Sequence, residues 1–162
     1  MRKILRPPEL VDDSWRYSSE DTAGATGVIV PVAEFLAAPA VWTGGKVGVR
    51  MGPADKVEDL APHLPGIALV AVEFPSIAEG RGYSQARQLR QQSGFKGEIR
   101  AVGAGVKRDL LLAMARSGID SFELAPGQSL ASALEGLATF SLAYQAGVPV
   151  RGVDISRFAA PR

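Results

Sequence analysis

The chain has 162 residues, of which 46% are hydrophobic and 22% are charged, and its formal net charge is +1. These proportions are typical of globular domains, and no apolar run is long enough for a membrane-spanning helix, so we expect one cytoplasmic domain. Because the chain contains no cysteine, disulfides, thiolate nucleophiles and iron–sulfur clusters held by its own thiolates are excluded.

Residues 1–26 are polar and rich in turn formers, and we interpret them as a lead-in with one short hairpin near Ile4 and Trp15. From Val28 onward, short β-branched runs alternate with helical segments that end at glycine or proline. One of these helices is expected from about Ser84 to Ser93, with Gly94 as its C-terminal cap. The expected strands cover residues 28–32, 46–51, 67–73, 98–102 and 121–124, and the last one precedes a helix with its N-cap at Ser129.

The five strand–helix units predict a mostly parallel sheet, because parallel neighbours need a long crossover between them. The fold class is therefore α/β, with an open three-layer sheet in residues 27–146. The alternative is an incomplete β/α barrel, because a closed eight-stranded barrel typically needs about 250 residues. Residues 147–162 have no helical periodicity and are interpreted as an extended or mobile tail.

A single histidine, His63, stands between Pro62 and Pro65, before a strand rather than after one. Ligands of open α/β sheets gather at the carboxyl ends of the strands, so this position favours an exposed or packing role for His63. With one histidine, no cysteine and no metal-binding motif, we predict no metal site.

Charge is unevenly distributed along the chain. Residues 76–116 carry eight Lys or Arg side chains against Glu79, Glu98 and Asp109, whereas the first 75 residues have a net charge of −3. This asymmetry predicts a basic face.

Two segments that follow strands have the composition of an anion site. In the first, Gly80 and Gly82 flank Arg81 just before a helix, which favours either an anion site or a tight loop with solvated arginines. In the second, Gly103 and Gly105 form half of a dinucleotide-binding motif, but the third glycine is absent, which argues against NAD and leaves a phosphate-like or sulfate-like anion open. The residues predicted to bind an anion or a partner are Arg81, Gly82, Tyr83, Ser84, Arg87, Lys107 and Arg108. They form one surface if the strands ending at residues 73 and 102 are neighbours.

Glu73 ends an apolar strand, where a carboxylate is partly desolvated unless it is paired. It is either a base or half of a structural ion pair, with Arg81 or Arg100 as the expected partner. Arg50, which lies near the end of another strand, belongs to the same edge of the predicted sheet.

From Leu69 to Tyr144 the sequence resembles an uncharacterised bacterial family, the domain of unknown function 934. The resemblance rests on Val72-Glu73-Phe74-Pro75, Gly80-Arg81-Gly82-Tyr83-Ser84, Gly97-Glu98-Ile99-Arg100-Ala101-Val102-Gly103 and Gly118-Ile119-Asp120-Ser121-Phe122. Members of that family are encoded beside sulfite reductase genes and are described as oxidoreductases of sulfite reduction. This chain departs from the family after Gly103, where Ala104 and Gly105 replace a typical aspartate.

The resemblance implies a role in sulfate assimilation and cysteine biosynthesis. Our first hypothesis is an accessory protein of assimilatory sulfite reduction, which binds the reductase or its electron donor through the basic face. The alternative is a small enzyme or sensor that binds an anionic metabolite, such as a sulfur oxyanion, a nucleotide or a flavin, at the carboxyl ends of the strands. We expect neither nucleic acid nor a membrane as a partner, and the sequence assigns no catalytic residue and no cofactor.

Overall fold

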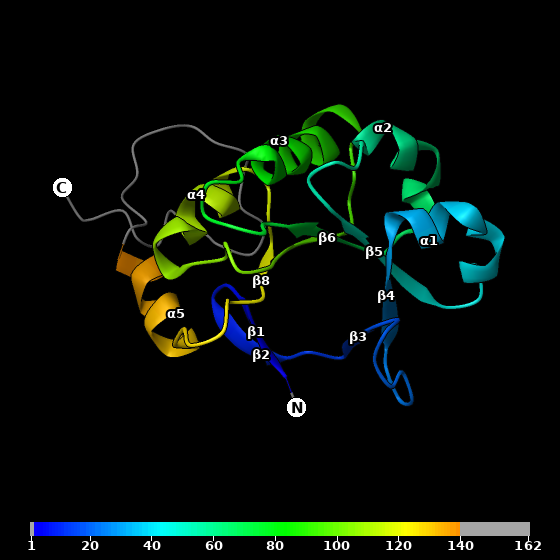
Figure 1. Cartoon of the computed structure of the whole chain (residues 1–162). Coiled ribbons are helices and arrows are strands. Elements are labelled where there is room, and N and C mark those ends of the chain that lie inside the picture. The colour runs from blue at the N-terminus through cyan, green and yellow to red at the C-terminus, as the bar shows by residue number, and fades with distance from the viewer. Residues whose placement is uncertain (1, 140–162) are drawn as a thin grey trace.

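The computed structural model describes residues 2–139, and its elements follow one another around a curled sheet (Figure 1). The strands are β1 (Lys3–Arg6), β2 (Glu9–Asp12), β3 (Trp15–Tyr17), β4 (Gly27–Pro31), β5 (Lys46–Met51), β6 (Leu69–Glu73), β7 (Glu98–Val102) and β8 (Ser121–Phe122). The helices are α1 (Val32–Ala37), α2 (Val57–Leu60), α3 (Arg81–Arg87), α4 (Leu111–Arg116) and α5 (Leu130–Thr139). Short 3-10 turns follow α1 and α2 and precede α4. The predicted tail, 147–162, lies outside the described residues.

The sheet has the strand order β2-β1-β8-β7-β6-β5-β4-β3. Strands β3 to β8 are parallel to one another, whereas β1 is antiparallel to both β2 and β8. Each of β4 to β8 is followed by a helix, as the alternation in the sequence predicts. The α/β class and the mostly parallel sheet are confirmed, and the curl corresponds to the incomplete-barrel alternative (Figure 1).

The main hydrophobic core lies between the convex face of the sheet and the helices. Side chains that point outward from the parallel strands, such as Val49, Val70 and Ile99, belong to the same buried cluster as Leu89 of the helical layer and Met114 of α4. Strand β6 is buried on both faces from Leu69 to Val72, which explains its continuous apolar sequence.

A smaller hydrophobic cluster fills the concave face of the sheet. It occupies the place that a second layer of helices would take in the predicted three-layer arrangement. It consists of Trp15, Ile29, Leu69, Ala71 and Val102. The Trp15 ring lies against the backbone of β4 and β5, where a Cβ atom on Gly48 would be 3.2 Å from the indole. The segment before β4 therefore contributes to the core of the sheet through Trp15.

The structure corrects two details of the predicted elements. The hairpin pairs Ile4 with Val11, whereas Trp15 lies in β3 at the opposite edge of the sheet. The helix expected from Ser84 begins earlier, at Arg81, so Gly82 lies in its first turn. A glycine is required at position 82, because a Cβ atom there would be 2.6 Å from the Phe74 ring. A π-helical turn extends the helix to Gln92, and Gly94 follows with φ 62° as the predicted C-terminal glycine.

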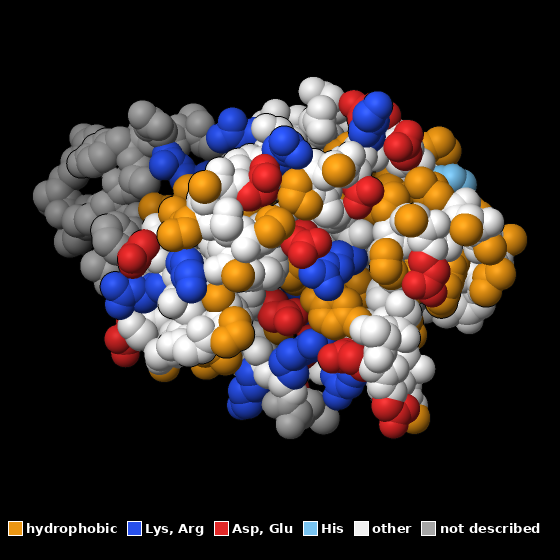
Figure 2. Space-filling view, in the orientation of Figure 1, with side chains coloured by type: hydrophobic (Ala, Val, Ile, Leu, Met, Phe, Trp, Pro, Cys, Tyr) orange, Lys and Arg blue, Asp and Glu red, His pale blue; other side chains and the backbone are white. Residues whose placement is uncertain are grey.

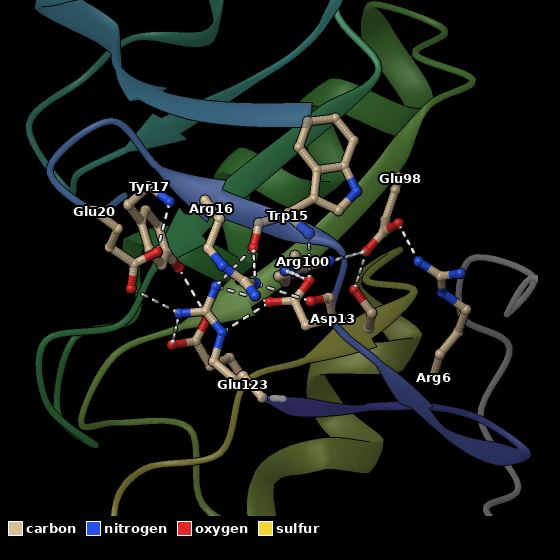
Figure 3. Close-up of polar contacts among 11 residues, drawn as sticks. Arg6, Asp13, Trp15, Arg16, Tyr17, Glu20, Glu98, Arg100 and Glu123 are labelled. Carbon is tan, nitrogen blue, oxygen red and sulfur yellow. Dashed lines mark hydrogen bonds and ion pairs between the residues drawn. The ribbon is translucent and has the colours of Figure 1, made fainter. Parts of the chain in front are cut away.

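A polar network on the concave side joins β1 and the segment between β2 and β3 to β7 and β8 (Figure 3). We name it the closing network, and its members are Arg6, Asp13, Glu98, Arg100 and Ser121. Arg100 of β7 and Asp13, which links β2 to β3, form an ion pair at 3.0 Å, and both side chains have 0% exposure. Arg100 also donates to Glu98 at 3.0 Å, and Glu98 accepts from Ser121 at 2.6 Å and pairs with Arg6. A buried guanidinium with these partners is neutralised and hydrogen-bonded, as burial of a charge requires.

We predict that Asp13→Ala lowers the free energy of unfolding by about 3–5 kcal/mol, because it removes the buried carboxylate that pairs with both Arg100 and Arg2 and leaves Glu98 as the remaining acidic partner of the buried Arg100 guanidinium among the described residues. Urea unfolding measures this loss. The matched control is Asp12→Ala, since Asp12 pairs with Lys3 at 3.9 Å where both side chains are more than half exposed. The control is expected to cost about 0.5 kcal/mol or less. Equal losses of unfolding free energy in Asp13→Ala and Asp12→Ala would contradict the structural importance of the buried Asp13–Arg100 pair.

Candidate functional site

The carboxyl ends of the parallel strands meet at one edge of the sheet, where sites of α/β folds and barrels usually form. Five side chains gather there around the mouth of the concave face. They come from the N-terminus, β3, β5, β6 and the residues after β8, and we name them the mouth cluster: Arg2, Tyr17, Arg50, Glu73 and Glu123.

Hydrogen bonds and ring contacts connect the mouth cluster. Arg50 donates to Glu73 at 2.7 Å, and the Tyr17 hydroxyl donates to Glu123 at 2.9 Å. The guanidinium carbons of Arg2 and Arg50 lie 5.1 and 5.6 Å from the centre of the Tyr17 ring. Arg2 also pairs with Asp13 at 2.8 Å, which joins the mouth cluster to the closing network.

The environment of Tyr17 makes it a hydrogen-bond donor rather than a base. Burial raises the pKa of its hydroxyl well above the ordinary value, and the charge of Glu123 and the hydrogen bond to it raise this pKa further. The pKa of Arg50 is also raised, because the hydrogen bond and charge of Glu73 outweigh the opposing effect of burial. Every charge of the mouth cluster has a partner of opposite sign, so the cluster joins the lead-in to the parallel strands and offers no activated nucleophile.

Glu73, one of the residues singled out from the sequence, therefore takes part in an ion pair. Its partner is Arg50 of the neighbouring strand, rather than Arg81 or Arg100. The Glu73 side chain is 26% exposed, so this pair lies at the rim of the mouth.

The predicted residues of α3 fall into two groups. Gly82 packs under Phe74, and the Tyr83 ring meets Phe74 edge-on with centroids 5.2 Å apart, so these two residues serve packing. The others, Arg81, Ser84 and Arg87, are exposed. Glu79 accepts from the Arg81 backbone N–H at 3.0 Å and lies 3.7 Å from its guanidinium.

Lys107 and Arg108 border a surface cavity of about 500 Å³ at the carboxyl ends of β7 and β8. Arg108 is fixed in place, because its guanidinium donates to Asp109 and Ser132 at 3.1 Å each. Lys107 is half-buried and has no partner within residues 2–139. The cavity is lined by Ile77, Lys107, Arg108, Asp109, Leu110, Gly127, Gln128, Ser129 and Ser132.

The two segments predicted as anion sites, around Gly82 and Gly105, lie after the neighbouring strands β6 and β7. The Gly105 N–H donates to the Phe74 carbonyl at 2.7 Å. Among the described side chains, no hydrogen bond or ion pair joins Arg81 to Lys107 or Arg108. Lys107 and Arg108 thus share a cavity, to which none of the predicted α3 residues contributes.

Two of the eight cations in residues 76–116 belong to the interior. Arg100 lies in the closing network, and Arg90 pairs with Asp120 and donates to the carbonyls of Phe95, Gly97 and Gly118. The remaining six are at least partly exposed, against the exposed or half-exposed acids Glu79 and Asp109. Figure 2 shows acidic and basic side chains side by side in the middle of one face, and Lys and Arg side chains spread over the side formed by α3, α4 and α5.

Three further observations concern metal binding, His63 and membrane spans in the described part of the chain. Between residues 2 and 139, no three His, Asp or Glu side chains are grouped to hold a metal ion. His63 packs edge-on against Phe35 with centroids 5.6 Å apart. In the same part of the chain, no helix combines the length and apolar character needed to cross a membrane.

Sequence reasoning missed Arg2, Tyr17 and Glu123 as members of the mouth cluster. One sequence feature could have indicated Tyr17: Trp15 and Tyr17 are two positions apart, which is typical of a strand with one aromatic face. Their partners are far away in the sequence, and Tyr17 and Glu123 are separated by 106 positions.

We predict that Tyr17→Phe lowers the free energy of unfolding by about 1–3 kcal/mol at pH 8, because it removes the hydrogen bond to Glu123. The pKa of Tyr17 is higher in the folded protein than in the unfolded chain. The stability that the Tyr17 hydroxyl contributes to the fold is therefore complete below about pH 10 and declines as the pH rises further. Urea unfolding between pH 8 and 11 should therefore show the difference between wild type and variant narrowing above pH 10.

The control is Tyr83→Phe, which removes a hydroxyl without a hydrogen-bond partner among the described residues. It is expected to cost little at pH 8. A Tyr17→Phe loss no larger than this control would contradict the role of the Tyr17 hydroxyl.

The comparisons with known proteins identify a family but no activity. None of the curated proteins matches the chain. The model of a family described as bacterial protein of unknown function (DUF934) matches residues 48–152, well over half of the chain. The matched segment includes β6, β7, β8 and the helices that follow them, whereas β1 to β4 precede it. The chain therefore belongs to the DUF934 family of bacterial proteins.

Proposed function

We propose that this protein is a cytoplasmic accessory protein of assimilatory sulfite reduction, which binds sulfite reductase or its electron donor through a basic surface. We define this basic surface as Arg81, Arg87, Lys107 and Arg108. The observation that carries the proposal is that these cations remain at the surface, while Arg90 and Arg100 are used inside the fold.

The physical basis of docking is charge complementarity. Exposed cations on α3 and on the loop after β7 attract an acidic partner and speed its encounter, and they contribute more to rate and specificity than to affinity. Arg87 has no partner within the described residues, and the Arg81 guanidinium has only the loose contact with Glu79. Both side chains can pair with carboxylates of another protein without breaking a strong internal contact.

We propose the sulfite reduction pathway on the basis of the family resemblance, which implies genes encoded beside those of sulfite reductase. The oxidoreductase role given to those relatives requires a redox group. This chain has no cysteine, and the charges of its mouth cluster are paired. In our proposal, the electrons are therefore carried by the partner.

A second candidate function is a small enzyme or sensor for an anionic metabolite. The observation that favours it is the cavity of about 500 Å³ beside Lys107, whose ammonium has no partner among the described residues. A thermal-shift screen with anions distinguishes the two functions, since a ligand that binds only the folded state raises the apparent stability.

We predict that replacing Arg81 and Arg87 together by glutamate weakens binding to the purified cognate sulfite reductase or its electron donor by about tenfold or more. Biolayer interferometry at low salt measures the dissociation constant and the association rate. Wild-type binding should also weaken as salt is raised, because exposed charges are screened.

The matched control replaces Lys46 and Lys56 by glutamate, which makes the same change of charge at exposed cations outside the basic surface. This control should keep most of the binding. No binding to either protein at low salt, or equal losses in the two double variants, would overturn the proposed docking.

A genetic test addresses the pathway separately. Deletion of the gene should slow growth when sulfate is the only sulfur source, and cysteine should restore growth. Normal growth of the deletion strain on sulfate would contradict a role in assimilation.

A further inference from the structure

The cavity beside Lys107 is much larger than a simple inorganic anion requires. Its volume of about 500 Å³ falls within the range of roughly 300–1,000 Å³ typical of small-molecule sites. A water molecule accounts for about 30 Å³ in the liquid, and a sulfur oxyanion has only a few heavy atoms more. Volume therefore favours an organic ligand over bare sulfite or sulfate.

The polar groups that remain available on the cavity wall are mainly donors. Lys107 contributes an ammonium without a partner in the described chain. The Gln128 side-chain oxygen accepts from the Arg108 N–H at 2.9 Å, which leaves the Gln128 NH₂ group as a donor. Asp109, the acid of the lining, is paired with Arg108. An anionic group is the natural complement of this wall.

An apolar residue stands on the same cavity. Ile77, in the loop after β6, is 65% exposed and is one of the few large hydrophobic side chains of the described chain that are exposed to this extent. Leu110, partly buried, also lines the cavity. Exposed apolar area beside a cation matches a ligand with a flat organic part and a charged group.

The loops that build the cavity are fastened to one another. Gly103 has φ 108°, and a Cβ atom there would lie 2.6 Å from the Phe74 carbonyl oxygen, so the loops after β6 and β7 are in contact. The Ala125 N–H donates to the Val106 carbonyl at 3.1 Å, which joins the loops after β7 and β8. The cavity is thus largely preformed, and ligand binding needs little ordering of the chain.

We infer that this cavity binds a mononucleotide, with its phosphate on Lys107, its base over Ile77 and the Gln128 amide within reach of a polar edge of the ligand. This inference rests on the second candidate function and narrows its ligand from anions in general to one class. Lys107 and Arg108 belong to both the cavity and the basic surface, whereas Arg81 and Arg87 do not line the cavity, so variants of Arg81 and Arg87 test partner docking separately.

The test uses isothermal titration calorimetry of the full chain with AMP, GMP, CMP and UMP, and with inorganic phosphate, sulfate and adenosine as reference probes. At least one mononucleotide should bind about tenfold more tightly than phosphate, sulfate or adenosine alone. Binding of phosphate or sulfate as tight as that of every mononucleotide would support an anion site but overturn this inference. Absence of mononucleotide binding would overturn it as well.

Three variants assign the contacts. Lys107→Met should weaken mononucleotide binding about tenfold or more, whereas Lys56→Met, at an exposed cation outside both the cavity and the basic surface, should leave it unchanged. Ile77→Ser should weaken mononucleotide binding several-fold without affecting phosphate binding, and the variant should stay folded because the Ile77 side chain is exposed. Circular dichroism checks that each variant is folded. Unchanged mononucleotide binding by Lys107→Met would overturn the assignment of the site.

Discussion

The buried ion pair between Asp13 and Arg100 is the interaction on which the curled sheet depends. Asp13 lies between β2 at one edge of the sheet and β3 at the other, and Arg100 projects from β7 near the middle of the strand order. Because neither charge is exposed, each needs the other to offset the cost of desolvation. The pair therefore attaches the segment between β2 and β3 to the middle of the sheet, next to Trp15 of the concave cluster.

The charged residues near this ion pair and at the mouth of the sheet fall into two groups. The closing network and the mouth cluster use their charges internally, and they attach β1, β2 and β3 to the parallel strands (Figure 3). The basic surface and the Lys107 cavity lie on α3 and on the loops after β6, β7 and β8, where Arg87 and the Lys107 ammonium have no partner among the described residues. The structural roles and the proposed binding roles thus fall on different residues at the same edge of the sheet.

The sequence predicts the elements that depend on local patterns. The β-branched runs gave the parallel strands β4 to β8, Gly94 marked a helix end, and Ser129 is an N-cap whose hydroxyl accepts from the Ser132 N–H at 3.2 Å. The sequence could not show that Arg90 and Arg100 are internal, because their partners are distant in the chain. Asp13 is 87 positions from Arg100, and the segment that contains it has the polar composition of a lead-in.

Hydrogen–deuterium exchange tests most directly whether the basic surface, and not the internally paired charges, binds the partner. The exchange is measured with and without the cognate sulfite reductase or its electron donor at low salt. If the basic surface is the docking site, the partner should slow exchange in residues 76–92 and 103–116 and leave residues 2–20 unchanged. Protection of residues 2–20 and the mouth cluster, with none in α3 or the loop that contains Lys107, would contradict the account.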